Sequence, residues 1–66
     1  MRKEDVEYFL NRFVIAIHQD GDTEGYVKGV VLTISEDSIV VENSRGQRCV
    51  LALKSLTKVR EIAHEV

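Results

Sequence analysis

The chain contains no proline and no tryptophan, and it has a single cysteine, Cys49. One cysteine excludes an intrachain disulfide framework and any zinc site built from several cysteines. No stretch approaches the ~18 apolar residues of a membrane helix, and no secretory signal is visible. We therefore expect a cytoplasmic protein that has no membrane partner. Because proline is absent, no segment is excluded from the interior of a sheet on that ground.

Patterns typical of catalysis or of cofactor binding are also missing. Neither histidine has a serine, cysteine or carboxylate at the spacing of a triad or a metal site, and no glycine-rich phosphate loop occurs. Asp20–Gly25 matches the first half of a calcium loop, but Val31 stands where the twelfth-position glutamate belongs. We interpret Asp20–Gly25 as an acidic, solvated loop, and we expect no enzyme, no cofactor and no metal site.

Size and charge restrict the partners. A chain of 66 residues buries only ~60% of its unfolded surface, which predicts a single domain, residues 1–66, that is stabilised by further copies or a partner. The net charge of −2 argues against a simple basic nucleic-acid module. The charge is uneven, however. Residues 1–43 carry four cationic and nine acidic side chains, whereas residues 44–66 carry five and two.

The hydrophobic pattern predicts a mainly β protein. Valine and isoleucine supply 15 residues, and β-branched side chains favour strands. The start differs, because Val6, Phe9 and Leu10 form the apolar stripe of a short amphipathic helix. The predicted elements are a helix at about 3–11 and strands at about 13–18, 26–34, 38–43, 47–53 and 56–62. Such a short antiparallel meander, bent at a glycine in its second strand, closes most easily into a small barrel.

Strict alternation predicts the two faces of the last strand. One face would carry Leu56, Lys58, Arg60 and Ile62, and the other would carry Thr57, Val59 and Glu61. Four side chains are predicted to lie in the core of the barrel or in an interface: Val31, Ile39, Val41 and Leu51.

At Gly29–Asn43, GVVLTISEDSIVVEN, the chain resembles the Sm-like family, and most closely its bacterial branch, the Hfq RNA chaperones. In that family a glycine in the second strand is followed fourteen residues later by an asparagine that ends the third. The segment Phe9–Asn11 is similar to the family's helix, and the resemblance extends over about residues 6–62. It implies a five-stranded, bent antiparallel Sm-like (SH3-like) barrel with an N-terminal α-helix.

The resemblance also implies a homo-oligomeric ring that binds RNA as a chaperone or scaffold. Rings of this kind join strand four of one subunit to strand five of the next, here residues 47–53 and 56–62. Lys54 and Ser55 would then face the pore. Phosphate contacts would come from the remaining basic side chains of residues 44–66, which are Arg45, Arg48, Lys58 and Arg60.

The turn after the second strand departs from the Hfq pattern. Hfq has a glutamine and an aromatic residue there to hold uridine, whereas this chain has Glu36 and Asp37. Two carboxylates repel phosphate, so we expect any RNA to bind through residues 44–66 instead. The same acidic turn favours an alternative, a protein-interaction or assembly module on the same barrel that binds another protein and no RNA.

Overall fold

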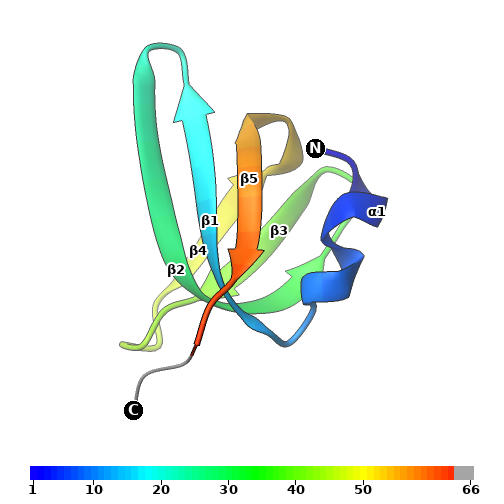
Figure 1. The fold of residues 1–66 in the computed structure, drawn as a ribbon, viewed down its shortest axis with the longest axis vertical. Helices are drawn as coiled ribbons and strands as arrows, with labels where there is room; N and C mark the ends of the chain where they lie inside the picture. The colour runs from blue at the N-terminus through cyan, green and yellow to red at the C-terminus, as the bar shows by residue number, and fades with distance from the viewer. Residues whose placement is uncertain (64–66) are drawn as a thin grey trace.

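The structure is a computed structural model that describes residues 1–63. In chain order its elements are α1 (Lys3–Val6), the 3₁₀ turn η1 (Glu7–Phe9), β1 (Phe13–Asp20), β2 (Thr23–Ile34), β3 (Ser38–Glu42), β4 (Arg48–Ala52), the 3₁₀ turn η2 (Leu53–Ser55) and β5 (Leu56–Glu61). The five strands form one antiparallel sheet in the order β4-β3-β2-β1-β5 (Figure 1). The predicted mainly β fold with one short N-terminal helix is confirmed.

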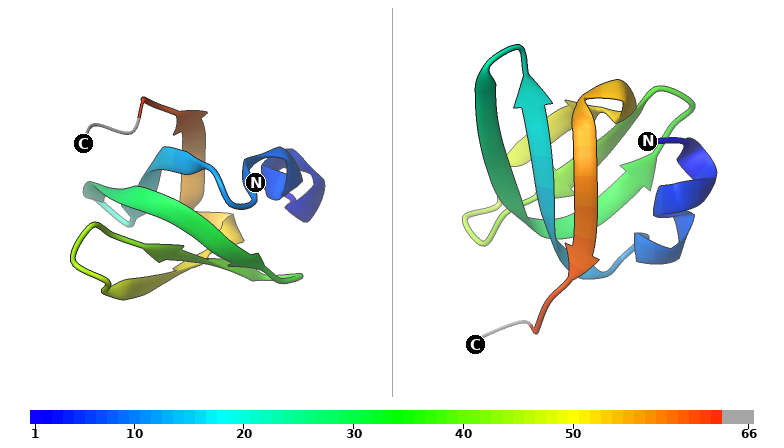
Figure 2. Two further views of the ribbon diagram at one scale, coloured as in Figure 1. Left: turned by 90° about the horizontal axis from the view of Figure 1, so that it is seen from below. Right: turned by 45° about the horizontal axis from the view of Figure 1, so that its top comes forward.

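The sheet is open at both ends. Strands β4 and β5 are its two edges, and within residues 1–63 no ladder joins them. Figure 2 shows that the sheet curves strongly and that the short helix stands beside it. No helix within the described part of the chain is long and apolar enough to cross a membrane.

The concave side of the curved sheet holds one apolar core. Its buried members come from every element except η1 and β4, and they are Val6, Val14, Ala16, Val31, Ile39, Val41, Leu53 and Leu56. Three of the four predicted core residues, Val31, Ile39 and Val41, are fully buried. The fourth, Leu51, is only partly buried, because it lies on the edge strand β4 and packs against the core from there.

The helix is shorter than the predicted 3–11. Regular α-helix ends at Val6, and the next turn tightens so that the Leu10 N–H donates to the Glu7 carbonyl, 3.3 Å away. Asn11 then adopts a left-handed backbone with φ of 64°. As a result Val6 is buried, but Leu10 leaves the predicted apolar stripe and is 44% exposed.

The predicted loop Asp20–Gly25 is wrong. The β1–β2 ladder continues to the pair Asp20↔Thr23, so only Gly21 and Asp22 form the turn. Gly21 has φ of 63° at the first central position, where a two-residue hairpin turn of type II′ requires positive φ. The acidic side chains of this segment therefore lie on a long protruding hairpin.

Gly29 permits close packing in the middle of β2. A Cβ at this position would overlap the carbonyl of Glu42 on β3 and lie 2.9 Å from Cγ1 of Val41. The β2–β3 register shifts three residues later, between Val31 and Thr33. The close approach and the shift together bend β2 around the core.

The predicted faces of β5 are also wrong. The ladder to β1 pairs His18 with Leu56 and Ile17 with Lys58, so Thr57 is an extra, bulged residue. A bulge reverses the alternation, and Val59 consequently faces the core together with Leu56. Lys58 and Arg60 both point to the convex side of the sheet.

Candidate nucleic-acid interface

The convex side of β5, β1 and β2 carries cations on either side of an apolar centre. We call this surface the outer face. Its first row runs Arg60–Ile15–Lys28 across the three strands, because Ile15 pairs with Arg60 on one side and Lys28 on the other. Side chains at directly paired positions lie on the same side of a sheet. Arg60 and Lys28 are exposed, and Ile15 between them is partly covered.

The second row adds an aromatic ring. Ile17 pairs with Lys58 on β5 and with Tyr26 on β2, in the order Lys58–Ile17–Tyr26. Tyr26 is 64% exposed. Within residues 1–63 its ring makes no stacking or cation contact. The two rows thus place an open aromatic ring and two isoleucines beside three cations.

The cations of the outer face have no anionic partner in the protein. Among the described residues, Lys28, Lys58 and Arg60 form no ion pair. Their positive charge is therefore available to an external anion. Phosphate is the anion that Lys and Arg pairs of this kind bind in nucleic-acid complexes.

A shallow hollow lies at the Tyr26 end of the outer face. It is lined by Ile15, Ile17, Glu24, Gly25 and Tyr26 and measures about 150 Å³. Gly25 lines the hollow with backbone atoms. On the concave side of the sheet, a Cβ at this position would lie 2.9 Å from the His18 ring. We call this feature the Tyr26 hollow.

A second depression, the end groove, lies where α1, the β2–β3 turn and η2 meet. Its volume is about 720 Å³, and its lining residues are Met1, Arg2, Lys3, Glu4, Glu36, Asp37, Ala52, Leu53 and Lys54. The structure thus brings the predicted Lys54 next to the Glu36–Asp37 turn. Lys3 already pairs with Glu36 at 3.3 Å, and three carboxylates offset the three cationic side chains of the groove.

The remaining predicted contacts lie elsewhere. Arg45 is exposed in the β3–β4 turn, where Asn43 Oδ1 accepts bonds from the Arg45 and Gln47 N–H groups. Arg48 on β4 donates from Nε to Glu42 on β3, 3.3 Å away. Ser55 is partly buried in η2, next to the exposed Lys54.

The six basic and polar residues predicted from the sequence therefore fall in three places. Lys58 and Arg60 lie together on the outer face, Lys54 and Ser55 lie at η2, and Arg45 and Arg48 lie at the β3–β4 hairpin. Tyr26 and Lys28 are not among the residues predicted from the sequence. The period-two pattern of β2, which puts both on one side of the strand, was the available signal.

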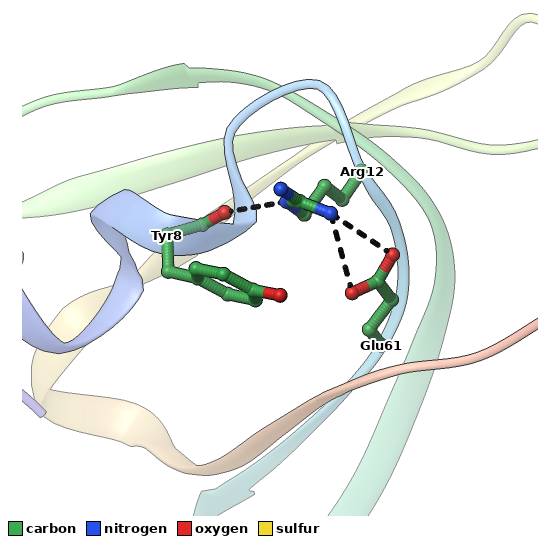
Figure 3. A network of polar contacts seen from close by, with 3 residues as sticks. All are labelled: Tyr8, Arg12 and Glu61. Atoms are coloured by element: carbon green, nitrogen blue, oxygen red, sulfur yellow. Dashed lines mark hydrogen bonds and ion pairs between the residues drawn. The ribbon is translucent and has the colours of Figure 1, made fainter.

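One further arginine is already engaged. Figure 3 shows Arg12 between the Tyr8 ring and Glu61. Its guanidinium lies 4.3 Å from the ring centroid, Nε donates to the Tyr8 carbonyl at 2.9 Å, and Nη1 donates to Glu61 at 3.3 Å. These contacts fasten η1 to the end of β5 and leave Arg12 little capacity for a ligand.

Comparisons with protein-family models, with curated proteins and with solved structures find no match to this chain.

Proposed function

We propose that this chain is an Sm-like, ring-forming protein that binds unpaired RNA as a chaperone or scaffold. The observation that carries the proposal is the outer face, where Lys28, Lys58 and Arg60 lie unpaired beside Tyr26. Proteins that bind single strands combine a cationic track for the backbone with aromatic rings on which bases stack. The outer face offers both on rigid strands.

The spacing of the outer face suits one strand of nucleic acid. Lys28 and Arg60 lie on β2 and β5, with β1 between them, so about 10 Å separates the two cationic edges at the usual strand spacing. Ile15 and Ile17 fill the space between these edges. Unpaired bases can lie on such an apolar centre with their phosphates at the edges, whereas in a duplex the bases are stacked inside.

The proposed ring rests on the two open edges of the sheet. Exposed edges tend to pair with another chain, and within the described residues β4 and β5 each have one side without a strand partner. Val50 on β4 lies on the same side of the sheet as its paired residue Val40 on β3, and its side chain is 69% exposed. Pairing β4 of one copy with β5 of the next would cover both edges and complete an Sm-like barrel wall around the core of each subunit.

A ring would also gather charge. Arg48 lies on the convex side of β4, and Lys58 and Arg60 lie on the convex side of β5. Pairing of these edges would bring cations of adjacent copies together. The local positive charge of this face is then repeated around the assembly, although each chain has a net charge of −2.

The exposed edge β4 also favours a second candidate, an interaction module without RNA binding. An extended segment of another protein could add to β4 by main-chain hydrogen bonds, with Val50 as an apolar contact. The end groove, whose charged side chains balance, would suit a polypeptide better than a polyanion.

Native mass spectrometry with and without oligo-U and oligo-A tests the proposal. We expect a discrete multiple of the 7.5 kDa chain that gains the mass of bound oligonucleotide. A 7.5 kDa monomer at micromolar concentration would overturn the ring. An oligomer that takes up neither oligonucleotide at low salt would favour the interaction module.

A further inference from the structure

We infer that the Tyr26 hollow is a nucleobase site that selects guanine through Glu24. This inference rests on the proposed RNA-binding function and adds base selectivity to it. The hollow measures about 150 Å³ and is open to solvent, so one unpaired base can reach its walls.

The walls of the hollow are those of a stacking site. Tyr26 offers an open ring, and Ile15 and Ile17 supply the apolar floor beside it. The Gly25 backbone continues that floor, and the His18 ring behind it leaves no room for a side chain. A base stacked on the Tyr26 ring would lie beside this apolar floor.

Among the described residues, Glu24 is the one charged side chain that lines the hollow. It lies two residues before Tyr26 on β2, and both side chains point to the convex side. Among residues 1–63 its carboxylate has no hydrogen-bond or ion-pair partner. Its cross-strand neighbour Gln19 does not bind it, since the Gln19 amide donates to the Gly21 carbonyl at 3.3 Å.

An ionised carboxylate can only accept hydrogen bonds. The Watson–Crick edge of guanine presents two adjacent donors, the ring N1–H and the exocyclic amino group, which match the two oxygens of Glu24. Adenine and cytosine present an amino group beside an acceptor nitrogen. Uracil presents its N3–H between two carbonyl oxygens, which the carboxylate repels. The expected order of preference is guanine first, adenine and cytosine next, and uracil last.

The surrounding charges fix how the nucleotide enters. Asp22 lies beyond Glu24 at the hairpin tip and repels the backbone, whereas Lys28 and Lys58 lie on the opposite side of the hollow. The phosphates of the bound nucleotide therefore point toward Lys28 and Lys58. The base edge then points toward Glu24.

The test is a titration at low salt of four labelled hexanucleotides, UUGUUU, UUAUUU, UUCUUU and UUUUUU. For the unmodified protein we expect about tenfold tighter binding of UUGUUU than of UUUUUU, near the low end for a bidentate base contact. Glu24→Gln should abolish this preference. Asp22→Asn, which removes the same charge from the same hairpin outside the hollow, should retain it.

Tyr26→Ala should weaken all four complexes, and Tyr26→Phe should restore them. Equal binding of the four hexanucleotides to the unmodified protein would overturn guanine selection alone, as would a preference that survives in Glu24→Gln. No binding of any hexanucleotide would overturn the proposed RNA-binding function together with this inference.

Discussion

The outer face and the end groove each contain three cationic side chains, but their surroundings differ. On the outer face, Lys28, Lys58 and Arg60 flank apolar side chains and have no carboxylate partner within the described residues. In the end groove, Glu4, Glu36 and Asp37 balance the cations, and one of these carboxylates forms an ion pair at 3.3 Å. A count of basic residues would rank the two regions as equal.

The difference teaches that charge pairing, and not the number of cations, separates a surface for polyanions from a neutral one. A phosphate that approaches the end groove must displace Lys3 from Glu36 and still meets the carboxylate of Asp37. A phosphate that approaches Lys28, Lys58 or Arg60 displaces water but breaks no ion pair among the described residues. The β3–β4 hairpin is intermediate, because Arg45 has no carboxylate partner in the described structure while Arg48 is paired with Glu42.

The largest expected effect concerns the sheet that carries both regions. Ile39→Ala removes a fully buried side chain and should lower the free energy of unfolding by ~2–5 kcal/mol. Leu51→Ala should cost less, because Leu51 is only partly buried. Urea unfolding followed by circular dichroism measures both, and Glu7→Ala at an exposed position outside the sheet is the control. A value near zero for both Ile39 and Leu51 would mean that the assigned strand faces are wrong.

The next effect would make the two regions alike. Glu36→Gln combined with Asp37→Asn removes two of the three described carboxylates of the end groove and leaves Lys3 without its ion pair. RNA affinity at low salt should rise about tenfold, since each unpaired cation becomes an additional phosphate contact.

Glu36→Gln with Asp37→Phe should tighten oligo-U specifically if the groove lines a pore. Glu7→Gln, which lies outside the groove, serves as the control in the same titration. Unchanged affinity in both double variants would show that RNA does not reach the groove.

The smallest effect concerns an arginine that is already paired. Arg12→Met breaks the contacts with Glu61 and the Tyr8 ring and should destabilise the fold by about 1 kcal/mol or less. RNA affinity should stay within a factor of two of the unmodified protein. Glu61→Gln breaks the same ion pair without removing a cation. If affinity changes, this variant distinguishes the loss of the cation from the loss of the ion pair. A tenfold loss of affinity in Arg12→Met alone would mean that a cation paired with a carboxylate still contributes to RNA binding.

Much of the fold could be predicted because its signals are local. Alternating and continuous apolar runs marked the strands. An asparagine and a glycine mark the Asn43–Gly46 turn, and in the structure Asn43 accepts a backbone hydrogen bond while Gly46 adopts a φ of 79°. Gly29 marked a special backbone position in β2, although its role is the close approach to Glu42. These features each depend on a few neighbouring residues.

The outer face could not be predicted because it depends on the register of three strands. Alternation alone put Lys58 and Arg60 on the same face as Leu56, and only the ladder with β1 reveals that Thr57 is bulged. Likewise, Tyr26 and Lys58 are distant in sequence and meet across Ile17 only through two ladders. Because a loop was predicted at Asp20–Gly25, the first residues of β2 were not assigned to a strand, and their place in the β1–β2 ladder could not be seen.

The most direct test of the central claim compares two triple variants in one experiment. Lys28, Lys58 and Arg60 are replaced by alanine in one, and Arg2, Lys3 and Lys54 in the other, so that each loses three cations. The slope of log K against log salt for a single-stranded RNA should fall by about 2 units in the first variant, at ~0.7 per phosphate contact, and should stay unchanged in the second. A fall in the second variant with no change in the first would contradict the account.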